Sequence, residues 1–368
     1  MSAALALGPR SPLDPQAPLV LLQHGGLDNL SGKTGLAMLR YRSGPIVAVV
    51  DPAHAGEDLG ALTGIQRAVP ILASLQEALP LGPQVAVVGL APSGGLLPEP
   101  LRRDLLAALA AGLNVASGLH TRLGDDPALA ALVGEGQWIW DLRQEPEGLQ
   151  VGAARAAALP GRRLLAVGSD MAVGKMSVCL ELRAAALGRG LDARFVGTGQ
   201  AGILIAGTGV PLDAVRVDYA AGAVERAVLE AGQGLPEDGL LLVEGQGSLC
   251  HPGSTATLPL IRGSQPTDLV LVHRAAQECI RERPGAAPVP IPPLEQLVAV
   301  VEALAALARP VGCVAAPPRV RAIALNTSGL DPAGASTAIE VCQNGLGLPT
   351  DDPVRNGGAT LLEALLGD

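Results

Sequence analysis

Residues 168–177 read G-S-D-M-A-V-G-K-M-S, and this stretch decides the fold of the second half of the chain. An apolar run, Leu164–Val167, precedes it, and a run with helical periodicity, Ser177–Leu187, follows it. Strand, glycine-rich turn, Gly-Lys and helix is the layout of a phosphate-binding loop (P-loop), in which backbone N–H groups and a helix N-terminus surround a phosphate. We therefore predict a phosphate site here, with Lys175 supplying a positive charge.

The distribution of lysine singles out the same loop. Of the 26 Lys and Arg residues only two are lysines, Lys33 and Lys175. They stand in similar settings, G-K-T at 32–34 and G-K-M-S at 174–177. Because lysine is a compact charge on a slim stem and arginine is a planar fork, we interpret both lysines as positions where arginine would not fit. Lys33 and Thr34 are expected to bind a second anion, such as a substrate carboxylate.

The loop departs in two ways from the usual P-loop pattern G-x-x-x-x-G-K-[ST]. Five residues separate its glycines, and Met176 stands where the magnesium-binding hydroxyl belongs, with Ser177 one position later. A weakened magnesium site indicates a loop that holds a diphosphate without hydrolysing a nucleotide. The predicted phosphate contacts come from the loop and the first helical turn: Gly168, Ser169, Val173, Gly174, Lys175, Met176 and Ser177.

Composition narrows the classes of partner. A chain of 368 residues predicts two to three domains, and a net charge of -9 argues against nucleic acid as the main partner. No apolar run is long enough for a membrane span, and the first residues lack the pattern of a signal peptide. Five scattered cysteines without a CxxC pair suit reduced thiols. We expect a cytoplasmic homo-oligomer that acts on a small molecule.

Apolar runs bounded by glycine alternate with helical runs in both halves of the chain, which predicts βαβ units and two parallel sheets. The fold class is therefore α/β, with a Rossmann-like N-terminal domain and a P-loop NTPase-like C-terminal domain. The predicted strands of the first half are Leu19–Leu22, Ile46–Val50, Val85–Val88 and one that begins at Asn114–Ala116, followed by a predicted edge strand at Trp138–Leu142. The predicted parts are a Pro-rich arm (1–17), the Rossmann-like domain (18–150), a linker (151–163) and the P-loop domain (164–368).

Polar residues of the first half follow the predicted strands, at the edge where open α/β sheets bind ligands. Asp51 follows the second strand, where a Rossmann domain would hold a ribose, but the first turn lacks G-x-G-x-x-G, which disfavours a nicotinamide dinucleotide. All five histidines lie near predicted strand ends and suggest a histidine-lined crevice: His24, His54, His120, His251 and His273. None forms a helical H-x-x-x-H pair, so zinc is disfavoured.

In the second half, Glu244 follows the apolar run Leu240–Val243, the position of a Walker-B-like carboxylate. Such a carboxylate would serve a magnesium ion, a water or a substrate amine. Gln246, Ser248 and His251 follow in a glycine-rich stretch that favours close approach of a ligand. Asp170 lies inside the P-loop and either meets a metal or a substrate ammonium or caps backbone N–H groups. Candidate catalytic residues are Lys175, Asp170, Glu244 and His251.

These motifs carry a family resemblance. The loop G-S-D-M-A-V-G-K, V-E-G-Q-G-S at 243–248 and A-L-N-T at 324–327 resemble dethiobiotin synthetase, which implies that Asn326 contacts adenine. From about residue 18 onward the chain is similar to a two-domain bacterial family long classed as of unknown function. The shared motifs include V-V-D-P-A-H-A-G at 49–56, A-P-S-G-G at 91–95, S-G-L-H at 117–120, and V-E-G-Q-G-S-L-C-H-P at 243–252. Members of that family have been assigned D-glutamate N-acetyltransferase activity.

The resemblance implies an N-acetyltransferase that uses acetyl-CoA and a small amino acid such as D-glutamate. Coenzyme A carries a diphosphate but no transferable γ-phosphate, so the missing hydroxyl at Met176 would cost nothing chemically. The expected substrate-binding residues are Lys33, Thr34, Asp51, His54, His120, Gln246 and Ser248. Two alternatives stay open: a ligase or kinase that uses ATP and Mg²⁺, with Glu244 near the metal, and a regulatory protein that binds a nucleotide without turnover.

Overall fold

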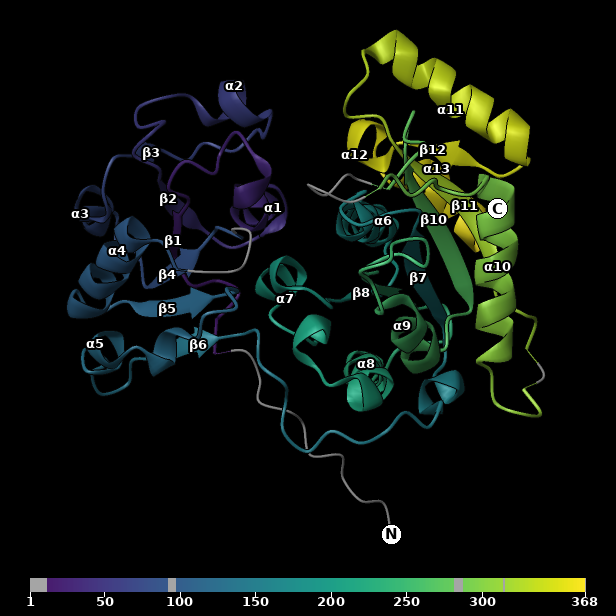
Figure 1. The fold of residues 1–368 in the computed structure, drawn as a ribbon, viewed down its shortest axis with the longest axis horizontal. Helices are drawn as coiled ribbons and strands as arrows, with labels where there is room; N and C mark the ends of the chain where they lie inside the picture. The colour runs from purple at the N-terminus through teal and green to yellow at the C-terminus, as the bar shows by residue number, and fades with distance from the viewer. Residues whose placement is uncertain (1–11, 92–96, 281–286, 314, 368) are drawn as a thin grey trace. The chain divides into compact units, whose positions relative to one another are not determined.

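The computed structural model describes residues 12–91, 97–280, 287–313 and 315–367 (Figure 1). The chain forms two compact units. Unit 1 contains the chain up to Glu145 together with Gln200–Ala214, and unit 2 contains Pro146–Gly199 and Val215 onward. Each unit is built around its own six-stranded parallel sheet, so the predicted α/β fold with two parallel sheets is confirmed.

The sheet of unit 1 has the strand order β3-β2-β1-β4-β5-β6. This is the Rossmann order, in which β1 and β4 lie side by side although their connections leave in opposite directions. Four predicted strands match β1, β2, β4 and β5, and the predicted edge strand is β6. The elements of unit 1 are β1 (Leu19–Leu22), η1 (Leu30–Gly32), α1 (Lys33–Tyr41), β2 (Ile46–Val50), α2 (Leu59–Thr63), β3 (Ile71–Leu72), α3 (Leu75–Ala78), η2 (Leu79–Leu81), β4 (Val85–Val88), α4 (Glu99–Ala110), β5 (Asn114–Ser117), η4 (Leu123–Asp125), α5 (Pro127–Ala130), β6 (Ile139–Asp141), α7 (Gln200–Ala206) and η6 (Leu212–Ala214).

Alternation along the strands of unit 1 builds two hydrophobic layers, one on each face of the sheet. Leu19 and Leu21 of β1 pack with α1, α2 and α7, whereas Val20 and Leu22 pack with α3, α4 and α5. All four of these strand residues are 0% exposed. Burial on both faces explains why the strand reads as a continuous apolar run.

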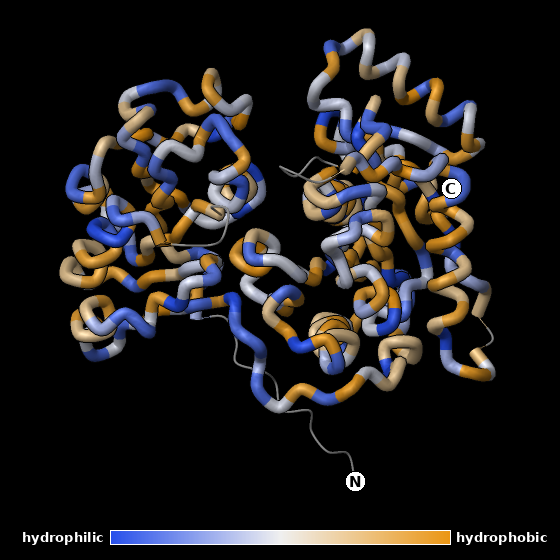
Figure 2. The backbone as a smooth tube through the Cα atoms, viewed as in Figure 1, coloured by the Kyte–Doolittle hydropathy of each residue, from blue (hydrophilic) through white to orange (hydrophobic). Residues whose placement is uncertain are grey.

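The sheet of unit 2 has the order β12-β11-β10-β7-β9-β8, with β7 next to both β9 and β10. The chain turns in opposite directions after β7 and β10, so the P-loop at the end of β7 lies at the switch point of this sheet. The central strands of this sheet are themselves hydrophobic segments (Figure 2). The elements are η5 (Arg155–Ala158), β7 (Arg162–Gly168), α6 (Lys175–Gly188), β8 (Ala193–Val196), α8 (Val217–Ala231), β9 (Leu240–Val243), α9 (Thr257–Ser264), β10 (Asp268–Arg274), α10 (Leu294–Leu307), β11 (Arg319–Asn326), α11 (Pro332–Leu346), β12 (Thr350–Asp351), α12 (Pro353–Asn356) and α13 (Ala359–Leu366).

The compact units differ from the predicted domain ranges in the segment Gln200–Ala214, which was assigned to the P-loop domain. Ile203 and Leu204 of α7 are buried in the core of unit 1. Arg143 fixes both ends of this segment, because its Nη2 lies 2.7 Å from Gln200 Oε1 and 2.8 Å from Asp213 Oδ2. Sequence spacing gave no sign of this excursion, since α7 follows β8 as an ordinary βα connection would.

The predicted N-terminal arm and the predicted linker both contain residues that contact a compact unit. Residues 1–11 of the predicted arm lie outside the described residues, but Leu13 is 2% exposed and belongs to the core of unit 1. In the predicted linker, the backbone N–H groups of Ala153 and Arg155 donate to Glu225 Oε1 of α8. Among the described residues no helix is long and apolar enough to cross a membrane.

Candidate functional site

The P-loop connects β7 to α6 in a conformation that needs its glycine. Gly174 has a φ of 116°, a region that L side chains rarely adopt, and Ala172 also has a positive φ of 55°. The N–H of Ser169 donates to the carbonyl of Val272 at 3.0 Å, which attaches the start of the loop to β10. Helix α6 then begins at Lys175 without a side-chain cap, so its first N–H groups face the loop. This arrangement suits an anion.

Lys175 lies inside the loop. It is 6% exposed, and its Nζ donates to the carbonyl oxygen of Asp170 at 2.8 Å. Its stem passes two glycines: an added Cβ at Gly168 would lie 2.7 Å from Nζ, and one at Gly245 would lie 2.9 Å from Cδ. Burial lowers the pKa of Lys175 to about 8, against the opposing charges of Asp170 and Glu244. The negative charge of a phosphate beside Nζ would stabilise the ammonium form of Lys175, as water does for an exposed lysine.

Asp170 caps a backbone N–H group. Its Oδ1 accepts from the N–H of Met171 at 2.6 Å, and its Oδ2 accepts from Nε2 of Gln277 at 2.7 Å. Of the two roles left open by the sequence, the structure therefore shows the capping one in this state. Gln277 follows β10 and was not predicted, because nothing in the sequence near it resembles a site motif.

Ser169 connects the loop to two neighbouring strands. Its carbonyl accepts from Ser248 Oγ at 2.9 Å, and its Oγ lies 2.8 Å from Nδ1 of His273. Burial lowers the pKa of His273 to about 4, so this imidazole is neutral near pH 7. Ser248, which was predicted, therefore supports the loop backbone. His273 was grouped only with the other histidines, and its contact with the loop comes from strand order.

Glu244 lies at the end of β9 and is 7% exposed. Its Oε2 accepts from the N–H groups of Thr198 and Gly199, at 2.8 and 3.1 Å. Gln246 Nε2 donates to the carbonyl of Thr198 from the same loop. The carboxylate thus holds the turn after β8 while it remains next to Lys175, whose pKa its charge raises. A magnesium ion here would compete with these two N–H groups for Oε2.

His251 is 4% exposed, and its Nδ1 accepts from the N–H of Gly253 at 3.0 Å. An accepting Nδ1 carries no proton, so in the neutral ring the proton is on Nε2. In this arrangement the imidazole presents a donor rather than a base through Nε2. To act as a base, this predicted catalytic residue would need the other tautomer, with an unprotonated Nε2.

Asn326 ends β11 beside the loop. Its Nδ2 donates to the carbonyl of Val173 at 2.8 Å, which places this side chain against the P-loop; its predicted contact with adenine stays a prediction. Arg274, at the end of β10, extends Nη2 to the carbonyl of Ala172 at 3.3 Å and Nη1 to Ser328 Oγ at 3.3 Å. Arg274 was not predicted, because it is one of 24 arginines with no motif around it. Met176 and Ser177 occupy the first turn of α6, as the spacing predicted.

The predicted residues of unit 1 differ in their exposure to solvent. Lys33 begins α1 and stays accessible to solvent; its pKa is lowered by desolvation and then by the Arg143 guanidinium, while Asp213 opposes them. The side chain of Thr34 is buried, and its Oγ1 finds no hydrogen-bond partner in the described part of the chain. His120, by contrast, is exposed after β5.

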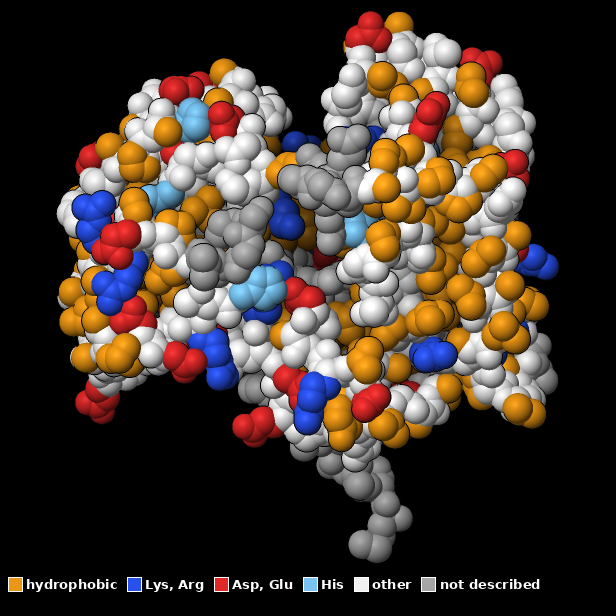
Figure 3. Space-filling view, in the orientation of Figure 1, with side chains coloured by type: hydrophobic (Ala, Val, Ile, Leu, Met, Phe, Trp, Pro, Cys, Tyr) orange, Lys and Arg blue, Asp and Glu red, His pale blue; other side chains and the backbone are white. Residues whose placement is uncertain are grey.

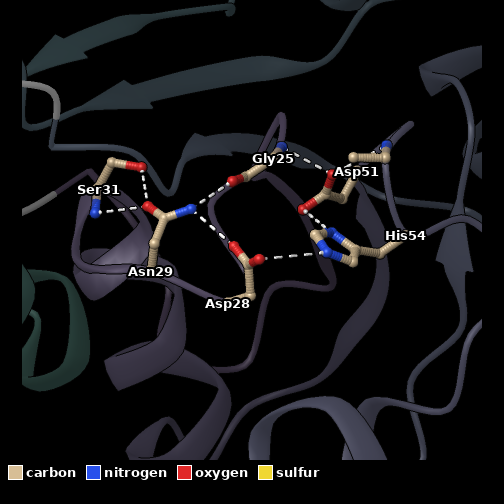
Figure 4. Close-up of polar contacts among 7 residues, drawn as sticks. Gly25, Asp28, Asn29, Ser31, Asp51 and His54 are labelled. Carbon is tan, nitrogen blue, oxygen red and sulfur yellow. Dashed lines mark hydrogen bonds and ion pairs between the residues drawn. The ribbon is translucent and has the colours of Figure 1, made fainter.

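Asp51 is directed toward Gly25, in the turn after β1, and toward His54 (Figure 4). It is 0% exposed, and its Oδ1 accepts from the N–H of Gly25 at 2.7 Å. Oδ2 lies 3.3 Å from Nδ1 of His54, whose Nε2 lies 3.8 Å from Asp28. The carboxylate therefore stabilises the turn after β1, where a Rossmann domain would offer it to a ribose. His24, with Nε2 2.9 Å from Asp104 Oδ2, is also paired within unit 1.

The structure brings together the predicted residues of unit 2. Loop residues 168–175 lie with Glu244, Gln246, Ser248 and Asn326, and the structure adds His273, Arg274 and Gln277. Of the five histidines, His24, His54 and His120 belong to unit 1, and His251 and His273 belong to unit 2. The A-P-S-G-G motif at 91–95 lies largely outside the described residues.

Fold and site together define a two-domain α/β protein with a Rossmann-like domain and a P-loop domain. Residues 150–362 match the P-loop domain, and residues 52–145 the Rossmann-like domain, of the DUF1611 family, a family described as of unknown function. The chain belongs to this family.

Two curated relatives of this chain carry the same name, which states an activity. The chain is 34% identical over 352 residues to a protein of Tritonibacter scottomollicae named D-glutamate N-acetyltransferase, covering 95% of this chain and 98% of the relative. A protein of the same name from a Pseudoalteromonas species is 34% identical over 286 residues, covering 77% and 82%. A crystal structure of a DUF1611 protein from Anabaena variabilis is 49% identical with a TM-score of 0.88, covering 96% of this chain and 100% of that one. The relatives indicate an enzyme, most simply a transferase.

Proposed function

We propose that this protein is an acetyl-CoA-dependent N-acetyltransferase that acts on a small amino acid resembling D-glutamate. The observation that carries the proposal is the P-loop itself. It presents the buried Lys175 and the open N-terminus of α6, while Met176 takes the position of the magnesium-binding hydroxyl. Such a loop suits a diphosphate that is held and not cleaved. The names of the curated relatives support the same reaction.

The reaction requires a base, a nucleophile and an oxyanion donor. Deprotonation of the substrate's α-ammonium would free its lone pair to attack the thioester carbonyl, and collapse of the tetrahedral intermediate would expel the CoA thiolate. Glu244 and Asp170 are the candidate bases, because both are carboxylates beside the loop. A backbone N–H group or the Nε2–H of His251 would stabilise the oxyanion, since Lys175 is assigned to the diphosphate. Lys33 and Thr34 of unit 1 are proposed to bind a carboxylate.

A paired assay separates this function from the ATP-dependent alternative. Thiol release from acetyl-CoA is measured with a panel of D- and L-amino acids, and ADP release is measured in parallel with Mg-ATP. We expect thiol release that depends on a dicarboxylic D-amino acid. ADP release without thiol release from any amino acid would overturn the proposal in favour of a ligase or kinase.

Glu244→Gln is the matched variant, because the amide oxygen can still accept from Thr198 and Gly199. If Glu244 is the base, turnover falls by about a hundredfold while CoA affinity stays near the wild-type value. A protein that binds CoA without any turnover, in the wild type and the variant alike, would instead be a regulatory binder.

A further inference from the structure

We propose that a cavity beside the P-loop of unit 2 binds the pantetheine arm of coenzyme A. The cavity has a volume of about 490 Å³ and lies at the carboxyl ends of β10 and β11, between the start of α10 and helix α11. Its wall includes His273, Leu294, Leu325, Val341 and Cys342. Its size falls within the range of small-molecule sites. The inference rests on the proposed use of acetyl-CoA and adds where the uncharged arm lies.

The ends of β10 and β11 present two chemically different faces. His273 pairs in register with Leu325, and both line the cavity. The next pair, Arg274 and Asn326, reaches the carbonyls of Ala172 and Val173 in the P-loop instead. Because side chains alternate along a strand, one face offers a cation and an amide, and the other offers an apolar hollow.

The charges assign the two ends of coenzyme A to these two faces. Its 3′-phosphoadenosine end carries a dianion, and its pantetheine arm is uncharged. Among the described residues that line the cavity, none is Lys or Arg, and Glu295 is a carboxylate that would repel a phosphate. His273 adds no charge near pH 7, because burial lowers its pKa to about 4. The phosphoadenosine end therefore fits the side of Arg274, and the arm fits the cavity.

The cavity wall and the P-loop are built as one structure. His273 contacts Ser169 Oγ, and the wall residues Ala275 and Ala276 are followed directly by Gln277, which donates to Asp170. Ala276 has a φ of 59°, a strained conformation for a residue with a side chain. The turn that shapes the wall is thus held by the same loop that would hold the diphosphate. A ligand anchored at the loop would have the cavity within reach of its arm.

Helix α11 supplies the outer wall and offers a matched pair of substitutions. Ala335 is the one buried residue of this helix, so substitutions at its other positions disturb little of the core. Ala338 lines the cavity, whereas Ala333 on the same helix is exposed and does not. Ala338→Phe would therefore place a ring in the cavity, and Ala333→Phe adds the same ring at a position away from it.

Isothermal titration with CoA and with adenosine 3′-phosphate 5′-diphosphate (3′-phospho-ADP), which keeps both phosphates of the diphosphate and lacks only the arm, tests the proposal. We expect wild type and Ala333→Phe to bind CoA about tenfold more tightly than 3′-phospho-ADP, and Ala338→Phe to lose most of this preference. Affinity for 3′-phospho-ADP should be the same in all three proteins. The proposal is overturned if Ala338→Phe weakens 3′-phospho-ADP as much as CoA, or if wild type shows no preference for CoA.

Thiol labelling provides a second readout that needs no substitution. Cys342 lies in the cavity wall, and Cys313 is exposed beyond the other end of α10. CoA should slow maleimide labelling of Cys342 but not of Cys313, and 3′-phospho-ADP should protect neither. Equal protection of Cys342 by both ligands would contradict the assignment of the arm. Binding of ATP with no binding of CoA would overturn the proposed function itself, which the titrations distinguish from a misplaced arm.

Discussion

The two Gly-Lys turns of this chain look alike in sequence and differ in structure. Lys175 is buried within its loop, with Nζ on the carbonyl of Asp170 and its stem between two glycines. Lys33 begins α1 and stays accessible to solvent. The turn after β1 is closed by the chain's own side chains: Asp51 accepts from Gly25, and Gln23 donates to the carbonyl of Gly32. A Gly-Lys pair thus indicates a helix start, and only the surrounding backbone decides whether it forms a phosphate cradle.

The two halves also differ in the region around each loop. In unit 1 the buried Asp51 fills the position where a nucleotide-binding Rossmann domain presents an acid to a ribose. In unit 2 the P-loop adjoins a cavity on one side and Arg274 on the other. Helix α10 next to it leaves Val300 and Leu307 exposed, and hydrophobic side chains gather over this part of unit 2 (Figure 3).

The comparison is tested most strongly by removing each lysine charge in turn. Lys175→Met is expected to weaken CoA binding by about a hundredfold, because a charged donor to the diphosphate is lost. Lys33→Met is expected to change CoA affinity less than about threefold and to raise KM for the amino acid. Titration calorimetry and steady-state kinetics measure the two effects. Equal losses of CoA affinity would show that the two turns act on the same ligand.

Glycine substitutions test the backbone around each turn. An added Cβ at Gly245 would lie 1.6 Å from the carbonyl oxygen of Ala166 and also press on Lys175, so Gly245→Ala should cost about 2 kcal/mol of stability and weaken CoA binding. An added Cβ at Gly32 would lie 1.9 Å from the carbonyl oxygen of Gly26, so Gly32→Ala should cost a similar amount without affecting CoA affinity. Denaturant unfolding and calorimetry measure both quantities.

Gly188→Ala serves as the control for this pair. It ends α6, and an added Cβ there meets nothing within 4 Å, so its stability should stay the same or rise slightly. If Gly245→Ala leaves both stability and CoA affinity unchanged, the tight passage of the Lys175 stem is not needed for the site.

The pH dependence of binding gives a smaller effect that only Lys175 should produce. Burial lowers its pKa to about 8, so CoA affinity should fall by about tenfold from pH 7 to pH 9 as the ammonium loses its proton. The stability of the free protein should change in the opposite sense. In the unfolded chain Lys175 keeps its proton up to about pH 10.5, whereas in the folded protein it loses the proton near pH 8. Between these pH values folding no longer buries a charge, so the free energy of unfolding rises with pH.

Both pH trends should be absent from Lys175→Met, and the difference between the two proteins isolates the lysine from other groups. Calorimetric titrations at several pH values, together with thermal unfolding of the free proteins, measure them. A pH profile of CoA binding that is the same in wild type and Lys175→Met would contradict the assignment.

Local sequence patterns predicted most of the fold. The continuous apolar runs of β1, β2, β4 and β9 match their strands residue for residue, because strands of a parallel sheet are covered on both faces. The two-residue strands β3 and β12 were missed, since so short a segment carries no periodicity. The excursion of α7 into unit 1 was missed as well, because its apolar residues would suit either core.

What the sequence determined by itself is the P-loop: its strand, its glycines, Lys175 and the methionine at position 176 all lie between residues 162 and 176, so their spacing is a local property. Only the tertiary structure decided which distant residues meet that loop. His273, Arg274 and Gln277 reach it because β10 lies next to β7, and Asn326 because β11 lies next to β10. The tertiary structure also places α11 beside the ends of β10 and β11, where it forms the outer wall of the cavity. Such contacts arise from packing across some 100 residues or more, which no local pattern of side chains encodes.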